Sequence, residues 1–307
     1  ALIAFLLMAS VQASLIKVGT YNTPGTARSV AIGDNHAWVA DGYSGLQIID
    51  VSDPTNPTYK NARTDLGYVW SLAISWVYVY VTANTNLNII IAYPKAPQIY
   101  GTYNSLGEAC GVAVSGNYAY VVDNLLGLHI IDVSDKNNPK VVGFYNTEGS
   151  GRGVAVSGNY AYVANGTSGL RIIDVGTPTS PKLAGIYNTP GYAGGVAVSG
   201  NYAYVADGYS GLQIFDVSTP TSPKLAGSYN TPEYASGVAV SGNYAYVADD
   251  ISGLQIIDVS TPTSPKLAGS YNTPGYAIGV AVSGNYAYVA DGNSGLQIIA
   301  EAATIDG

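Results

Sequence analysis

The sequence predicts an all-β fold: a seven-bladed β-propeller with four-stranded antiparallel blades, closed by an N-terminal strand that completes the last blade. Three observations predict it. A phrase of the type GVAVSGNYAYVADG recurs along most of the 307 residues. Each copy divides into four short runs typical of strands, and none has a helical period. The segment near the N-terminus resembles the one piece that the last copy lacks.

The repeat has a nearly constant period. Its second residue recurs every 42 residues, with one spacing of 40, at Val30, Leu72, Val112, Val154, Val196, Val238 and Val280. A unit of about 40–45 residues that contains four strands is typical of a propeller blade. The chain therefore contains seven candidate blades.

The fifth copy shows the four expected strands, GVAVSG, NYAYVAD, LQIFDV and KLAGSYN, separated by Gly-, Asn-, Asp- and Pro-containing turns. The second and third runs are apolar on both faces, which indicates burial between neighbouring blades; a two-sheet sandwich leaves one polar face per sheet. The small residues of the first run suit the crowded innermost strand. The last run begins with Lys140, Lys182, Lys224 or Lys266 in four copies, and lysine on an outer edge strand opposes edge-to-edge pairing.

Closure of the ring is also predicted from the sequence. The seventh copy leaves the pattern at Ala300 and lacks its fourth run. The opening SLIKVGTYNTPG resembles the missing PKLAGSYNTPG, so we expect Ser14–Asn22 to pair with Leu296–Ile299. This gives one propeller domain over residues 14–299, preceded by an apolar segment at 1–13 and followed by a tail at 300–307.

The run GLQIIDVSTPTSPKLAG resembles the LVIVD-repeat proteins, and the resemblance extends from about Ser14 to Ile299. It implies a secreted or surface β-propeller, and implies little about activity. The second copy departs from the pattern, because it lacks the Asp-Gly turn, the Gly before Leu87 and the Asp-Val after Ile90. It is either a blade specialised for contact or a locally unreliable stretch of sequence.

Composition excludes several classes of function. Charged residues make up 10% of the chain and the net charge is −8, which disfavours nucleic acid as a partner. The single cysteine, Cys110, forms no internal disulfide and supports no thiolate metal site, so we expect neither metal nor cofactor. His36 and His129 vary at ordinary repeat positions, so no catalytic triad is indicated. We therefore expect a protein that is not an enzyme; a glycosidase pair among Glu108, Glu148 and Glu233 is the weakest interpretation.

The N-terminal run ALIAFLLMASVQA is apolar but too short to span a bilayer as a helix. Val11 and Ala13 fit a signal-peptidase cut before Ser14, which predicts a secreted, extracellular or cell-surface protein without an integral membrane span. The alternative is a retained segment that inserts into a neighbouring subunit. Its candidate inter-subunit residues are Leu2, Ile3, Phe5, Leu6 and Leu7.

Strand direction places the loops after the second and fourth strands on one face, which we call the tyrosine face. A partner-binding rim is predicted there from Tyr43, Tyr192, Tyr209, Tyr234, Tyr276, Asp41, Asp207, Asp249 and Asp291. Local turn chemistry is the alternative for the aspartates. Asn165 begins the sequon Asn-Gly-Thr and is a candidate glycosylation site. On the opposite face, Asp50, Asp132, Asp174, Asp216 and Asp258 are expected to form Asx turns.

Copies four to seven are nearly interchangeable, so the same surface is presented repeatedly. This favours a structural or adhesive scaffold that binds multivalently and assembles into filaments through its N-terminal segment. The alternative is a lectin-like module that binds glycans or proteins at the Tyr/Asp rim. The expected partners are further copies of the chain, other surface proteins or glycans.

Overall fold

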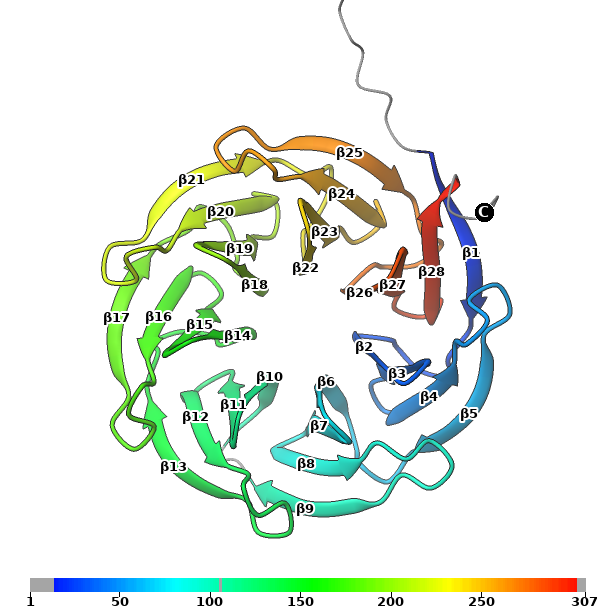
Figure 1. Ribbon diagram of the computed structural model, residues 1–307, viewed down its shortest axis with the longest axis horizontal. Helices are drawn as coiled ribbons and strands as arrows, with labels where there is room; N and C mark the ends of the chain where they lie inside the picture. The colour runs from blue at the N-terminus through cyan, green and yellow to red at the C-terminus, as the bar shows by residue number, and fades with distance from the viewer. Residues whose placement is uncertain (1–13, 105–106, 303–307) are drawn as a thin grey trace, which may run out of the picture.

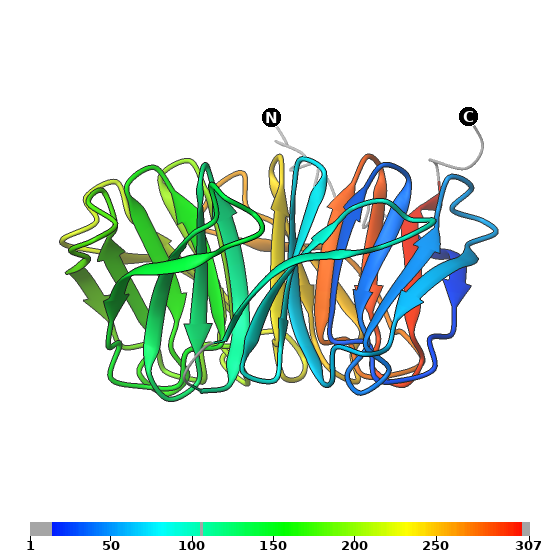
Figure 2. The ribbon, with the colours of Figure 1, turned by 90° about the horizontal axis from the view of Figure 1, so that it is seen from below.

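The computed structural model describes residues 14–104 and 107–302. Seven four-stranded antiparallel sheets stand around a central axis, which confirms the seven-bladed β-propeller (Figure 1). Seen from the side, every strand runs between two faces that carry the loops (Figure 2). No helix in the described part of the chain is long and apolar enough to cross a membrane.

Each of the first six blades uses consecutive strands, ordered from the axis outward. Blade 1 contains β2 (Ser29–Gly33), β3 (His36–Ala40), β4 (Leu46–Asp50) and β5 (Thr58–Arg63). Blade 2 contains β6 (Val69–Ser75), β7 (Tyr78–Ala83), β8 (Asn86–Ile91) and β9 (Ile99–Asn104). Blade 3 contains β10 (Ala109–Ser115), β11 (Tyr118–Asp123), β12 (Gly127–Asp132) and β13 (Lys140–Tyr145).

The next three blades repeat this order. Blade 4 contains β14 (Gly153–Ser157), β15 (Tyr160–Ala164), β16 (Leu170–Asp174) and β17 (Lys182–Tyr187). Blade 5 contains β18 (Gly195–Ser199), β19 (Tyr202–Ala206), β20 (Leu212–Asp216) and β21 (Lys224–Tyr229). Blade 6 contains β22 (Gly237–Ser241), β23 (Tyr244–Ala248), β24 (Leu254–Asp258) and β25 (Lys266–Tyr271).

Blade 7 combines the two ends of the described chain. It contains β26 (Gly279–Ser283), β27 (Tyr286–Ala290), β28 (Leu296–Glu301) and, as its outermost strand, β1 (Leu15–Tyr21). Lys17 pairs with Ile299, as expected from the sequence, and the pairing continues to Leu15 opposite Glu301. Strand β28 therefore runs two residues past the expected end of the propeller at Ile299. Because the first strand completes the last blade, the ring is closed.

The core lies between blades. Each of the seven hydrophobic clusters combines the second and third strands of one blade with residues of its neighbour. Between blades 5 and 6, for example, Leu212 and Ile214 pack with Val247 and Ile257. All four residues are fully buried. This two-sided burial explains why these strands lack an alternating apolar pattern.

A glycine in the fourth strand lets neighbouring blades approach closely. A Cβ atom placed on Gly143 would lie 1.9 Å from the carbonyl oxygen of Pro178, which belongs to the β16–β17 turn of the next blade. The register also shifts beside this position, because Ile130 pairs with Gly143 and Ile131 pairs with Val141. The repeated Gly and the Pro-rich turn are therefore two halves of one contact between blades.

Blade 2 keeps four strands despite its divergent sequence. Its first hairpin turn differs most in residue type. Trp76 adopts φ = 57° at the position where other blades have Gly116, Gly158 and Gly200, with φ = 55–56°. The side chain of Trp76 is 93% exposed. A bulky residue in this conformation is uncommon, and strain of this kind persists where the surroundings or a function require it.

Candidate functional site

The predicted tyrosines occupy two positions on the tyrosine face. Tyr43 and Tyr209, in the turns after the second strands, are 83% and 77% exposed, and Tyr276 is also exposed. Tyr192 and Tyr234 lie further in, and line the mouth of the central channel. Tyr276 shares the repeat position of Tyr192 and Tyr234 but is exposed, so the predicted rim combines three exposed rings with two rings at the channel mouth.

Outer and inner tyrosines meet between neighbouring blades. The ring centroids of Tyr209 and Tyr234 are 5.1 Å apart in an edge-to-face arrangement. Tyr43 makes the same kind of contact at 4.7 Å with Tyr68, which was not among the predicted rim residues. Edge-to-face contacts of this geometry are favourable, so each pair fixes the position of the tyrosine side chain that lies nearer the axis.

The four predicted rim aspartates lie in the loop framework instead of on the surface. Asp41, Asp207, Asp249 and Asp291 have no exposed surface. The carboxylate of Asp207 accepts hydrogen bonds from Thr189 Oγ1 at 2.5 Å and from the Gly191 backbone at 2.8 Å. Their partners belong to the preceding inter-blade loop, so this is a clasp between loops and not a bond to the aspartate's own turn. These carboxylates are not available to a partner on the rim.

Burial raises the pKa of the Asp207 carboxyl above its ordinary value, and the hydrogen bonds from Thr189 and Gly191 oppose that effect only in part. Asp41 and Asp291 have the same environment and the same direction of pKa shift. We call these buried contacts the loop clasps. They attach the second-strand turn to the loop that leads into the same blade.

Asn165 occupies the clasp position of blade 4 and has no exposed surface. Its Oδ1 accepts a hydrogen bond from Thr147 Oγ1 at 2.9 Å, and its Nδ2 donates to the Thr147 carbonyl at 2.8 Å. The Asn165 side chain is thus buried and paired within the loop, and glycosylation there stays a prediction from the sequence.

The aspartates of the opposite face form the expected Asx turns. The Oδ1 atoms of Asp50, Asp132, Asp174, Asp216 and Asp258 each accept the backbone N–H two residues later, at 2.8–3.1 Å. Each of these bonds is local to its own turn. Within residues 14–104 and 107–302, no three His, Cys, Asp or Glu side chains are grouped so that they could hold a metal ion.

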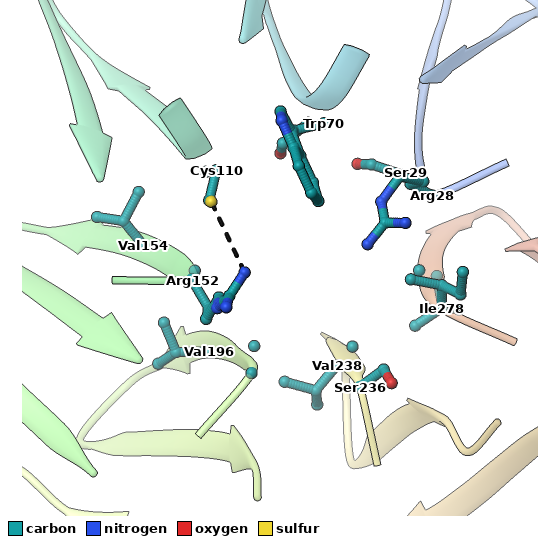
Figure 3. A pocket seen from close by; sticks show the side chains of 18 of the residues that line it. Arg28, Ser29, Trp70, Cys110, Arg152, Val154, Val196, Ser236, Val238 and Ile278 are labelled. Atoms are coloured by element: carbon teal, nitrogen blue, oxygen red, sulfur yellow. Dashed lines mark hydrogen bonds between the residues drawn. The ribbon is translucent and has the colours of Figure 1, made fainter. Parts of the chain in front are cut away.

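The central channel opens into a cavity of about 600 Å³ at its tyrosine-face end. Seven side-chain positions surround it, one from each blade, each immediately before the first repeated residue of the inner strand (Figure 3). We call these positions the inner ring. The ring consists of Arg28, Trp70, Cys110, Arg152, Gly194, Ser236 and Ile278.

Backbone hydrogen bonds hold five of the seven ring residues, whereas Trp70 and Cys110 lie at register shifts within β6 and β10. The N–H of Ser236 donates to the Ala248 carbonyl at 2.8 Å, and Gly194 and Ile278 make the equivalent bond in their blades. One residue earlier, Ala235 exchanges two backbone hydrogen bonds with Gly208 of the preceding blade, both at 3.1 Å. The ring side chains therefore project from a rigid support.

Two guanidinium groups determine the charge of this site. The residues that line the cavity include Arg28 and Arg152 but no Asp or Glu. Neither arginine forms an ion pair with a carboxylate in the described residues. Burial raises the pKa of the Cys110 thiol to about 11, and this effect outweighs the nearby charge of Arg152. The cavity lining thus carries two positive charges in a protein of net charge −8, and Glu108 lies outside the lining but close enough to interact with Arg152.

Comparison with known proteins identifies the repeat. The LVIVD repeat model matches residues 24–64, 106–147, 148–189, 190–231, 232–273 and 274–299, which together are more than half of the chain. The chain belongs to the LVIVD-repeat family. The segment between the first two matches holds all four strands of blade 2, where the sequence departs from the pattern. Among curated proteins, none matches this chain in sequence.

Solved structures show the same fold at low identity. The RRP9 WD40 repeats have a TM-score of 0.76 and 12% identity over 94% of this chain and 97% of that one. The Neurospora crassa Pan2 WD40 domain has a TM-score of 0.73 and 14% identity over 95% of this chain and 96% of that one. The computationally designed Ika8 protein has a TM-score of 0.69 and 7% identity over 92% and 99%. At these identities the likeness supports only the propeller fold of the LVIVD-repeat protein.

The inner ring was missed in the sequence analysis, although the LVIVD repeat contains its signal. In blades 5, 6 and 7 the inner strand begins at the Gly of the phrase Tyr-Ala-x-Gly-Val, and x is Gly194, Ser236 or Ile278. A variable residue inside an otherwise constant phrase marks a position that the fold does not determine. Because this position varies among constant residues, a comparison of the constant residues does not identify it.

Proposed function

We propose that this LVIVD-repeat protein is a non-catalytic extracellular or cell-surface scaffold that binds a partner at the channel mouth on its tyrosine face. The observation that carries the proposal is the inner ring, where one variable position per blade converges on one cavity. The loop clasps and the backbone bonds between blades hold these positions rigidly, and rigid presentation of varied side chains is what a binding site requires.

The chemistry of the cavity favours binding over catalysis. Its lining offers guanidinium, hydroxyl, indole and thiol groups, but no carboxylate or imidazole that could act as a general acid or base. With a pKa of about 11, the Cys110 thiol is protonated at neutral pH and is a poor nucleophile. Exposed Tyr43, Tyr209 and Tyr276 extend the contact surface outward from the cavity.

Obstruction of the cavity tests this proposal. Gly194→Trp places an indole in the channel mouth, where blade 2 already carries Trp70. Purified wild type and variant are applied to an array of neutral and acidic glycans and immobilised surface peptides. We expect wild-type binding to at least one class and loss of that binding in the variant.

The matched control is Gly200→Trp, which adds the same side chain to a hairpin on the opposite face, as Trp76 does in blade 2. It should bind like wild type. Binding that survives in Gly194→Trp, or no binding by the folded wild type to any glycan or peptide of the array, would overturn the channel-mouth function.

A second candidate function is self-assembly, and the observation in its favour is the exposed apolar turn of blade 2. Trp76, Val77 and Tyr93 are 93%, 53% and 60% exposed. The left-handed conformation of Trp76 costs about 1 kcal/mol relative to glycine. We assign this turn to contact with a second copy of the chain. The inter-subunit residues predicted from the sequence, Leu2 to Leu7, lie outside the described residues.

Sedimentation velocity over a range of concentrations tests the assembly. Wild type should associate with increasing concentration, whereas Trp76→Gly should remain monomeric and become more stable by about 0.5–1 kcal/mol, because glycine adopts positive φ without strain. Identical monomeric profiles for both proteins would remove the second candidate.

A further inference from the structure

The two arginines of the inner ring form equivalent contacts three blades apart. Arg28 Nη1 donates to Tyr68 Oη at 2.9 Å, and Arg152 Nε donates to Tyr192 Oη at 2.7 Å. In both cases the tyrosine lies 40 residues later, at the start of the next blade. Each guanidinium is therefore held by a neighbouring blade before any ligand arrives.

The two sites differ in the next ring residue. Beside Arg28 this residue is Trp70, and the guanidinium carbon lies 4.6 Å from the indole centroid. Beside Arg152 it is Gly194, which has no side chain. Arg152 therefore lacks the stacked indole that Arg28 has (Figure 3), and its aromatic contact is with Tyr192, whose ring centroid lies 5.8 Å from the guanidinium carbon.

The donors of Arg152 are only partly used. Its Nε is bonded to Tyr192, and Nη1 makes a long contact of 3.9 Å with the Cys110 sulfur. A guanidinium has five N–H donors arranged as a planar fork. The terminal nitrogens therefore keep donors that can bind two oxygens of one anionic group.

Charge and surroundings restrict the ligand. A lining with two arginines and no carboxylate attracts an anion, while the rest of this acidic protein repels one. Tyr192, Tyr234 and Ser236 line the cavity together with Gly194, and the Tyr192 hydroxyl accepts the hydrogen bond from Arg152. Planar aromatic rings and hydroxyl groups suit the C–H faces and hydroxyls of a sugar, whereas a peptide needs an apolar anchor pocket.

We propose that the Arg152 side of the channel mouth binds the carboxylate of an acidic sugar, a uronate, with the sugar ring in the gap at Gly194. This inference rests on the proposed function and deepens it by naming the ligand class. Arg152 provides the bidentate contact, Tyr192 orients Arg152, and Arg28 contributes a second positive charge across the channel.

Titration calorimetry tests the assignment with three probes: trigalacturonate, neutral galactotriose and pentaglutamate. We expect trigalacturonate to bind at least about tenfold more tightly than galactotriose, because a charge-assisted bidentate contact is lost with the neutral sugar. Affinity should fall as salt is raised. Pentaglutamate should bind weakly or not at all.

Three variants place the contact. Arg152→Gln should weaken trigalacturonate binding at least about tenfold, and Arg152→Lys should weaken it by a smaller factor, since lysine keeps the charge without the fork. Arg63→Gln, which removes an exposed ion pair with Asp65 outside the channel, should bind like wild type. Thermal melting of each variant confirms that it is folded.

The outcomes separate the two proposals. If trigalacturonate does not bind, or binds equally to wild type and Arg152→Gln, the uronate assignment is wrong. Tighter binding of pentaglutamate than of trigalacturonate would replace the sugar with an acidic peptide. In either case, if Gly194→Trp abolishes the binding of another ligand, the channel-mouth function still stands.

Discussion

Two adjacent positions just before the inner strands differ sharply: the first belongs to the repeated framework and the second to the inner ring. Ala193, Ala235 and Ala277 are identical, fully buried and bonded to the preceding blade. The next residues, Gly194, Ser236 and Ile278, are half-buried and all different. One residue along the chain therefore separates a position determined by packing from a position free to vary.

This difference indicates how a highly repetitive protein can have a specific site. Repeated blades give a closed ring in which most surfaces are presented several times, which suits multivalent contact. Near the axis the seven copies converge on a single cavity, so variation at one position per blade produces one unique environment. Specificity then requires few changes, and none of them lies in the seven hydrophobic clusters between blades.

The largest effect is expected in the framework. Phe215 is fully buried between blades 4 and 5, with its ring 4.6 Å from that of Tyr187. Phe215→Ala should lower the free energy of unfolding by about 3–5 kcal/mol, the usual cost of removing a buried phenyl group. Urea unfolding followed by tyrosine and tryptophan fluorescence measures the change.

Leu225→Ala, in the outer strand of the same blade, is the matched control. Its side chain is 45% exposed, and it should lose at most about 1 kcal/mol. Equal losses for the two variants would show that stability does not reside in the packing between blades.

A smaller effect is expected at the clasps, and its sign follows from burial. The raised pKa of Asp207 means that the folded protein binds this proton more tightly than the unfolded chain. Stability from this group is present below the ordinary pKa of 3.8 and is lost as pH rises through the higher folded value. Asp207→Asn should remove this loss, and should use the amide arrangement already present at Asn165.

Urea unfolding of wild type and Asp207→Asn at closely spaced pH values above 3.8 measures this effect. On the opposite face, hydrogen bonds from the serine two residues later lower the pKa values of Asp50, Asp132, Asp216 and Asp258, that of Asp50 to about 2, so their stabilisation is lost only as pH falls below 3.8. The buried aspartates of the tyrosine face and the Asx-turn aspartates of the opposite face therefore change stability in separate pH ranges. If the free energy of unfolding of the variant depends on pH above 3.8 as steeply as that of wild type, the Asp207 carboxyl is not buried in its charged form.

Much of this architecture could be predicted from the sequence, because the period, the turn residues and the missing last strand each reflect backbone geometry. The burial of Asp41 and Asp207 could not, since their partners lie 16 and 18 residues earlier in another loop. The pairing of Arg152 with Tyr192 also depends on a contact between blades. Local patterns predict elements, whereas the site arises where distant elements meet.

The smallest effect on stability is expected in the inner ring, where the comparison can be tested with one substitution at adjacent positions. Ser236→Ile gives blade 6 the ring residue of blade 7, and stability should change by no more than about 0.5 kcal/mol. Ala235→Ile, one residue earlier, inserts the same side chain into a fully buried bridge and should cost about 1–3 kcal/mol. Thermal and urea unfolding of the pair measure the contrast. Similar costs at both positions would mean that the ring residue is set by packing, and its variation would then give no reason to place a binding site at the channel mouth.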